Sequence, residues 1–308
     1  MKRMDAVEVN RVFLLSIAVS QGMLYLLAYS GMRDTMMLQF LIEVFLALPG
    51  VYYLMAKKQP VRNLLGVSPL NKLQWLLLLP FAFCVETIGE FVNVLSQLFT
   101  PNVVGEHMLE LILKYPFPVA FFVIALMPAV CEEFIFRGIL YQGYRKYSVS
   151  GAIVLTAVLF GLMHMNMNQL SYAFVIGLLF AGINEVTGSV IPSVLLHLYI
   201  NGKSAVLLYL TTNEPQIAEE QYSVAELLPE LIPGVIVAVI GLVLIFCVLI
   251  KCRDAKKESA VMGGGIEAEN EKKGIAAWGE MGSPALLWGV LICIYFMMEE
   301  EIARMLIK

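Results

Sequence analysis

Apolar segments about as long as a membrane-spanning helix recur along this chain. A helix needs about 20 apolar residues to cross a bilayer, where every backbone polar group must be bonded within the structure. Hydrophobic residues make up 59% of the sequence and charged residues 15%, which is far more apolar than a soluble domain. We therefore predict an all-α, polytopic membrane helical bundle with about nine (eight to nine) transmembrane helices. The predicted spans are Val12–Gly31, Met36–Ala56, Leu73–Phe99, Phe117–Tyr141, Val149–Met165, Leu170–Val186, Val190–Leu210, Leu231–Ile250 and Pro284–Met305.

Basic residues in the loops predict the orientation, because cytoplasmic loops carry an excess of Lys and Arg. Four basic stretches alternate correctly for one side of the membrane, whereas the loop Thr211–Glu230 has five Glu and no Lys or Arg. We expect a cytoplasmic N-terminus in a bacterial plasma membrane, with the lipid bilayer as partner. The net charge of −4 gives no nucleic-acid signature. The basic residues are Lys2, Arg3, Arg11, Lys57, Lys58, Arg62, Lys72, Arg145, Lys146, Lys251, Arg253, Lys256, Lys257, Lys272 and Lys273.

Three segments between the spans have other patterns. Val103–Lys114 has apolar residues at helical spacing with charges between them, which is typical of an amphipathic helix at the outer interface. Thr211–Glu230 is expected to be an acidic external loop. Cys252–Gly282 contains a glycine run and many charges, so we expect a flexible cytoplasmic linker before the last helix.

Three charges interrupt the fourth predicted span, in PAVCEEFIFRGILYQGY. They are Glu132, Glu133 and Arg137. A charge within hydrocarbon costs at least about 2.5–3.5 kcal/mol, so such groups indicate function. Glu133 and Arg137 are four residues apart and share a helix face, which suits an ion pair. Glu132 is rotated by about 100°, which leaves it the free carboxylate.

Two of the three histidines also lie in predicted spans. His164 follows Phe160 by four residues in FGLMH, and Asn201 follows His197 by four in HLYIN. A carboxylate and an imidazole can act as general base and acid on a water molecule, and an amide can stabilise an oxyanion. The same Glu132, His164 and His197 could instead hold a divalent metal such as zinc. A lone His in an apolar helix is often only a packing residue, and Glu133–Arg137 could be purely structural.

These motifs resemble those of a known family. EEFIFRG (Glu132–Gly138), FGLMH (Phe160–His164) and HLYIN (His197–Asn201) are similar to the EExxxR, FxxxH and HxxxN motifs of the CAAX prenyl protease type II family. This is the CPBP or Abi group of intramembrane proteases, and the resemblance covers roughly Phe117–Leu210. The chain lacks the HExxH zinc motif, a GxSG serine motif and paired intramembrane Asp, which argues against other intramembrane protease types.

The resemblance implies an intramembrane endopeptidase that acts on a peptide or membrane-protein substrate, prenylated or not. It implies that Glu132 with His164 activates the hydrolytic water, and that His197 and Asn201 support the substrate carbonyl. Glu133 and Arg137 would order the helix and tune the site, with Phe160 in support. The family is commonly labelled metalloprotease, yet a glutamate-dependent mechanism without metal also fits. A non-catalytic membrane regulator, a bacteriocin-immunity protein or a transporter remain alternatives.

We expect five parts: N-terminal spans with the amphipathic segment (1–116), a CPBP-type core (117–212), an acidic loop with one span (213–250), a linker (251–283) and a C-terminal helix (284–308). At 1.5 Å per residue, Glu132 would lie roughly 20 Å from the outer end of its span, and His164 within about 5 Å of its own. They would meet only if a span is shifted, tilted or broken, and Pro128 is a candidate break.

Two further polar groups have more than one interpretation. Glu299, Glu300 and Arg304 also satisfy EExxxR, but we interpret them as an interfacial charged cap because no His follows. Another set shares roughly one face of the third span, where it could line a water-filled cavity or bond neighbouring helices. This second set is Glu86, Glu90 and Asn93.

Overall fold

The fold is a bundle of helices. The computed structural model describes residues 5–57, 62, 65–211, 224–262 and 276–307, and these residues contain no strand. The predicted all-α class is confirmed. The helices are α1 (Ala6–Tyr29), α2 (Thr35–Lys57), α4 (Lys72–Ser96), α5 (Val103–Lys114), α6 (Phe117–Phe121), the π-helix η1 (Phe122–Leu126), α7 (Met127–Glu133), the π-helix η2 (Phe134–Leu140), α8 (Tyr141–Tyr144), α9 (Val149–Met163), α10 (Met167–Thr187), α11 (Ile191–Thr211), α12 (Val224–Met262), α13 (Ala276–Gly279) and α14 (Pro284–Ile307).

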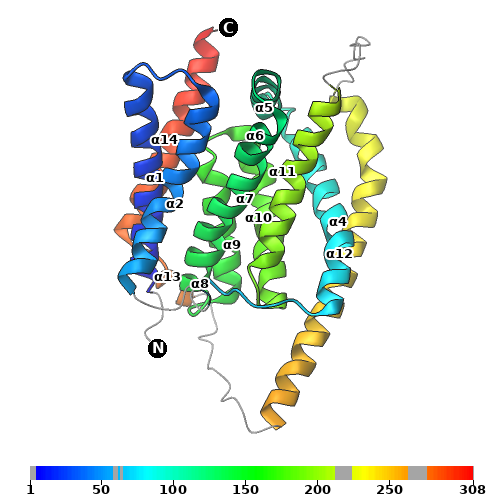
Figure 1. Cartoon of the computed structure of the whole chain (residues 1–308). Helices are drawn as coiled ribbons and strands as arrows, with labels where there is room; N and C mark the ends of the chain where they lie inside the picture. The colour runs from blue at the N-terminus through cyan, green and yellow to red at the C-terminus, as the bar shows by residue number, and fades with distance from the viewer. Residues whose placement is uncertain (1–4, 58–61, 63–64, 212–223, 263–275, 308) are drawn as a thin grey trace.

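The long segments run alternately between the two ends of the bundle (Figure 1). Within the described ranges, 7 helices are long and apolar enough to cross a membrane: α1, α2, α4, the continuous segment Phe117–Tyr144, α10, α11 and the Glu226–Ala255 part of α12. The chain is therefore a multi-pass membrane protein. α9 is apolar but has only 15 residues, and α14 carries Glu299 and Glu300 in its second half. All nine predicted spans are thus helical, and seven of them meet both criteria.

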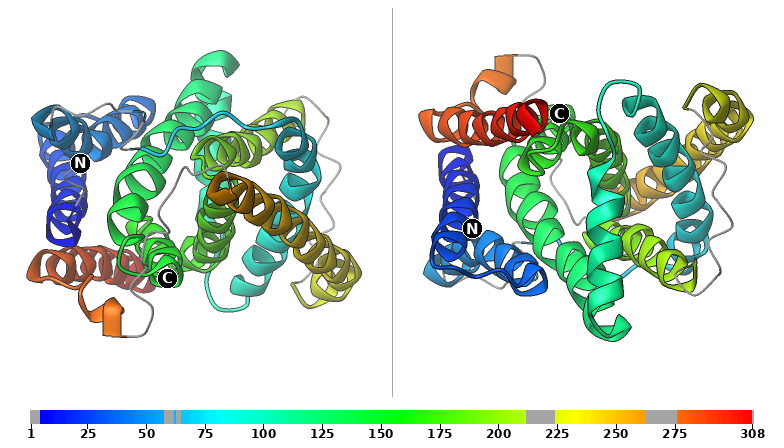
Figure 2. Two further views of the ribbon diagram at one scale, coloured as in Figure 1. Left: turned by 90° about the horizontal axis from the view of Figure 1, so that it is seen from below. Right: turned by 90° about the horizontal axis from the view of Figure 1, so that it is seen from above.

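Two flanking groups of helices enclose a central one. α1 packs against α2 and α14 on one flank, and α4 packs against α12 on the other. The chain from α6 to α11 lies between them, and Figure 2 shows the same order from both ends of the bundle. Because α2 also contacts α7 and α10 contacts α4, side chains from both flanks face the central helices.

Capping side chains fix where the central helices begin and end. Ser148 caps α9 and Asn166 caps α10, each accepting a hydrogen bond from a backbone N–H of the first turn. Only His164, Met165 and Asn166 separate the two helices, and Met165 turns the chain with a φ of 52°. α10 ends at Gly188, whose φ of 68° is the left-handed conformation that glycine adopts without strain. The short turn places His164 directly at the end of α9.

The segments between the spans match the expectations in part. The predicted amphipathic helix is confirmed as α5, at the end of the bundle opposite the N-terminus (Figure 1). Residues 252–262 continue α12, so this part of the predicted linker is helical. Residues 224–230 of the predicted acidic loop also belong to α12, whereas residues 212–223 and 263–275 lie outside the described part.

The chain remains helical through Pro128, the candidate break in the fourth predicted span. Proline lacks an N–H, and its ring crowds the carbonyl four residues earlier, so it usually kinks or breaks a helix. Here the π-helical turn η1 directly precedes α7, and η2 directly follows it. In a π-helical turn each N–H bonds to the carbonyl five residues earlier, and this wider turn accommodates the proline without ending the helix. Single π-helical turns are frequent at functional sites.

Candidate active site

The end of α7 and the following η2 carry the charged cluster. Glu133 and Arg137 are both fully buried, and Nη1 of Arg137 lies 2.9 Å from Oε1 of Glu133. The predicted ion pair is therefore confirmed. Nη2 of Arg137 also donates to the carbonyl of Gly177 at 3.4 Å, and the guanidinium lies 4.1 Å from the centre of the Phe160 ring. These contacts tie η2 to both α9 and α10.

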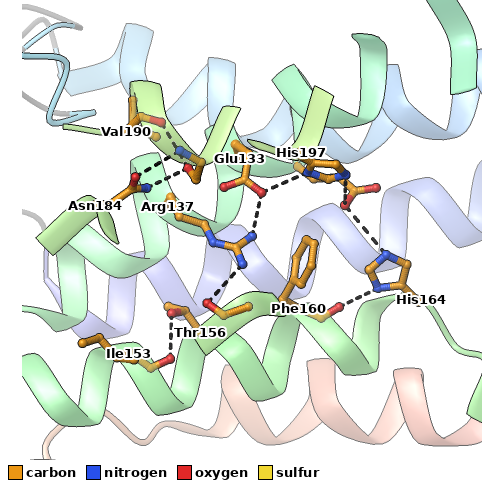
Figure 3. Close-up of polar contacts among 12 residues, drawn as sticks. Glu133, Arg137, Ile153, Thr156, Phe160, His164, Asn184, Val190 and His197 are labelled. Carbon is orange, nitrogen blue, oxygen red and sulfur yellow. Dashed lines mark hydrogen bonds and ion pairs between the residues drawn. The ribbon is translucent and has the colours of Figure 1, made fainter. Parts of the chain in front are cut away.

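His164 turns one ring nitrogen toward the backbone and the other toward Glu132. Nδ1 lies 2.7 Å from the carbonyl oxygen of Phe160 (Figure 3), and Nε2 lies 3.8 Å from Oε2 of Glu132. A carbonyl oxygen only accepts hydrogen bonds, so Nδ1 carries the proton in this contact. The Phe160 carbonyl thereby leaves Nε2 of His164 free to face the carboxylate.

His197, on α11, connects the two glutamates. Its Nδ1 lies 3.0 Å from Oε1 of Glu133, and its Nε2 lies 4.0 Å from Oε2 of Glu132. Glu133 thus contacts both Arg137 and His197, which fixes the orientation of the imidazole (Figure 3). Glu132 itself is buried, and its Oε2 has no hydrogen-bond partner among the described residues.

The depths of Glu132 and His164 agree when they are counted from the N-terminal end of the bundle. Glu132 precedes the end of α8, at Tyr144, by twelve residues, and His164 follows the 15 residues of α9. At 1.5 Å per residue, both lie about 18–22 Å from that end. Our expectation separated them because it took α9 as a full span. The helix is too short for that, and His164 lines a cavity between the helices.

Asn201 follows His197 by one turn of α11 and lines the same cavity. Its Nδ2 donates to the carbonyl of Ile124, in η1, at 3.3 Å. An amide nitrogen carries two N–H groups, so one remains for another acceptor. The structure therefore places all the predicted site residues in one cluster, and their roles in a reaction stay a prediction.

The cavity has a volume of about 870 Å³, and its wall includes Glu132, His164, His197 and Asn201. The polar residues on one face of α4 both line the cavity and bond to neighbouring helices. Glu86, Glu90 and Asn93 line the cavity, while Glu86 also accepts from Tyr199 at 2.9 Å and Asn93 from Asn168 at 3.1 Å.

The second EExxxR sequence does more than cap α14. Glu300 is paired with Arg304, accepts a hydrogen bond from Asn166 at 3.2 Å and lines the cavity. Glu299 accepts from Tyr25 at 2.8 Å. Glu300 therefore faces the turn between α9 and α10 and belongs to the wall of the cavity.

Sequence reasoning missed Glu43, a buried acid on α2 that lines the cavity. It is the single charged residue in the predicted span Met36–Ala56. The rule that singled out Glu132, that a charge within an apolar span indicates function, applies to it equally.

The candidate metal ligands do not form a metal site. Among the described residues, no group of three His, Cys, Asp or Glu side chains is arranged to hold a metal ion. Both imidazoles approach the same oxygen of Glu132, at 3.8 and 4.0 Å. Tetrahedral ligands at about 2.0–2.2 Å from a zinc ion lie about 3.3–3.6 Å from one another, which is closer than both of these contacts. We therefore derive no step through a metal.

Comparison with known proteins agrees with the motifs. Residues 114–202 match the model of a family described as type II CAAX prenyl endopeptidase Rce1-like. This segment resembles the Rce1-like family, as the motifs predicted. The Rce1-like segment contains Glu132, Glu133, Arg137, Phe160, His164, His197 and Asn201, whereas Glu43 lies outside it. Neither the curated proteins nor the solved structures gave a significant match. The family match supports a protease that works in a membrane.

The close approach of α9 and α10 in the Rce1-like segment gives a testable prediction. A Cβ at Gly177 would lie 3.0 Å from Cα of Ala157 and 3.4 Å from Nη2 of Arg137. We expect Gly177→Val to lower the melting temperature in detergent, because overpacking costs about 1–3 kcal/mol. Gly22→Val is the control, since a Cβ there meets nothing within 4 Å. Equal melting temperatures for the two variants would contradict the close approach.

Proposed function

We propose that the chain is an intramembrane endopeptidase that hydrolyses a peptide bond with a water activated by Glu132 and His164. The observation that supports it best is the 3.8 Å distance between Oε2 of Glu132 and Nε2 of His164. This distance is too long for a direct hydrogen bond but suits one water molecule at about 2.8 Å from both atoms. The carboxylate takes a proton from the water, and the imidazole orients it.

The substrate carbonyl is held beside that water. Attack on the carbonyl carbon places negative charge on its oxygen, and positioned donors stabilise this charge. The free N–H of Asn201 is one donor. His197, whose Nδ1 contacts Glu133, supports the carbonyl beside it. Glu133 orients His197, and Arg137 balances the charge of Glu133, so these two residues act through His197 instead of touching the substrate.

The substrate is a membrane-associated peptide or protein. The cavity lies between helices that face lipid, and its wall combines apolar residues with the polar site. The family match makes a prenylated Cys near a C-terminus the first chemistry to test. Unmodified membrane peptides are the alternative. The C-terminal ends of α2, α8 and α12 lie at the same end of the bundle as the N-terminus (Figure 1). We propose that this end is cytoplasmic.

Comparative peptidomics tests the function without a chosen substrate. Membranes of cells that carry the wild-type protein are compared with those that carry Glu132→Ala at equal abundance. The proposal expects peptides that form only with the wild-type protein and share one type of cleavage site. Identical peptide sets, with the cellular phenotype preserved in Glu132→Ala, would indicate a non-catalytic membrane regulator instead.

Metal removal gives a separate prediction. We expect dialysis of the purified protein against EDTA to leave its peptidase rate within about twofold, because the mechanism places the proton transfer on Glu132 and His164. The measurement is the initial rate on a quenched fluorescent peptide before and after dialysis. A loss of activity that zinc restores would show that a metal takes part.

A further inference from the structure

A second buried acid shares the cavity with Glu132. Glu43 is 3% exposed, and α2, on which it lies, packs against α7. Its Oε1 accepts a hydrogen bond from Nε2 of Gln39 at 3.5 Å, which is the limit for such a bond. Its Oε2 is buried and has no hydrogen-bond partner among the described residues. A buried polar atom without a partner needs an explanation, and a role toward a group bound in this cavity provides one.

Glu43 and Glu132 together hold too much negative charge to ionise at once. Both are buried in the wall of the same cavity, Glu132 on α7 and Glu43 on α2, and these two helices pack against each other. Arg137 and Nδ1 of His197 are both committed to Glu133. Within the part of the chain that the structure describes, no ion pair reaches Glu43. Two carboxyl groups in such a site share one proton, because two buried like charges repel.

The neighbours of the two acids separate their roles. Glu132 faces Nε2 of His164 and Nε2 of His197, at 3.8 and 4.0 Å, on the side where the proposed mechanism places the attacking water. Glu43 has only the amide of Gln39. A buried carboxyl group without a cationic partner remains neutral. Glu43 is therefore the acid of the pair, and Glu132 is the base.

We propose that Glu43 is a further catalytic residue, whose carboxylic acid protonates the leaving amine of the substrate. The proposal rests on the peptidase function above. It also extends the site to α2, which lies outside the matched residues 114–202. The cavity would then hold the scissile bond between α2 on one side and α7, α9 and α11 on the other.

The protons and bonds balance as follows. The water oxygen bonds to the carbonyl carbon, and Glu132 takes the proton that the water loses. The C–N bond then breaks, its electron pair stays on nitrogen, and Glu43 gives that nitrogen a proton. A proton passes from Glu132 to Glu43 and restores the starting state. The net reaction consumes one water and yields a carboxylic acid and an amine.

The identity of the leaving group separates this role from a structural one. An amide nitrogen must be protonated to leave, whereas the oxygen of an ester leaves far more readily without a proton. Loss of a general acid therefore slows amide hydrolysis much more than ester hydrolysis. A structural role of Glu43 would instead affect both substrates equally.

The experiment uses the purified full chain in detergent and two fluorescence-quenched peptides. Both end in a farnesylated Cys followed by three residues, and they differ only in an amide or an ester bond after the Cys. We expect Glu43→Gln to lower kcat/KM for the amide by about 10²–10³-fold, the usual contribution of general acid catalysis. We expect the ester rate to fall less than tenfold. Glu132→Gln should slow both.

Glu299→Gln is the matched control, because it makes the same change on α14, where Glu299 contacts Tyr25 and does not line the cavity. It should leave both rates within threefold. Equal losses for amide and ester in Glu43→Gln, or no loss, would overturn the role of Glu43. If Glu43→Gln does not accumulate, Glu43→Asp and Glu43→Asn make the same comparison of acid with amide. If neither the wild-type protein nor Glu299→Gln cleaves the amide peptide, the proposed function itself fails, and this inference with it.

Discussion

Replacement of Glu132 by glutamine is expected to abolish peptide cleavage while the protein still accumulates in the membrane. The variant keeps the size of the side chain but removes the base that takes a proton from water. We expect kcat/KM to fall by about 10²–10⁴-fold, the range for loss of general base catalysis. The measurement is the rate of the purified variant on a peptide that the wild-type protein cleaves, with its melting temperature as the check on folding.

The second EExxxR sequence supplies a matched control for this change. Glu299 has the position in that sequence that Glu132 has in the first, and it contacts Tyr25 instead of a histidine. Glu299→Gln should keep wild-type activity. Normal proteolysis by purified Glu132→Gln would refute the mechanism, because nothing else in the proposal takes the proton of the water.

Replacement of His164 by alanine is expected to have the second largest effect. The imidazole orients the attacking water through Nε2, and the Phe160 carbonyl fixes the ring at 2.7 Å from Nδ1. We expect kcat to fall by about 10²–10⁴-fold with little change in KM, because His164 acts on the water and not on substrate binding. Steady-state kinetics of the purified variant in detergent provide the measurement.

His107 makes the comparison specific to position. It is the one remaining histidine of the 3 in the sequence, and it lies on α5 at the wall of the same cavity. His107→Ala should keep its activity within about threefold, since the mechanism gives this residue no role. Equal losses in His107→Ala and His164→Ala would mean that the cavity, and not the contact with Glu132, sets the rate.

The sequence was most informative where one local rule decided the outcome. Apolar length predicted the helices, and charges within an apolar span pointed to the Glu133–Arg137 ion pair, since four residues make one helical turn. The bounds of α5 followed from its apolar spacing alone. The three motifs also indicated the family that residues 114–202 match.

Features that depend on packing between distant segments were not predictable in the same way. The apolar pattern gives no sign that α9 ends at the cavity, because a 15-residue apolar helix resembles a slightly shortened span. The continuation through Pro128 depends on the π-helical turns around α7, which residue propensities do not reveal. Glu43 joins the site only because α2 packs against α7.

The most direct test of the central claim is kcat/KM for the double variant Glu132→Gln with His164→Ala. If both side chains act on one water molecule, removing the second adds little once the first is gone. The account predicts that the double variant is within about threefold of the slower single variant. A loss equal to the product of the two single losses would contradict it, because it would show that the two groups act independently.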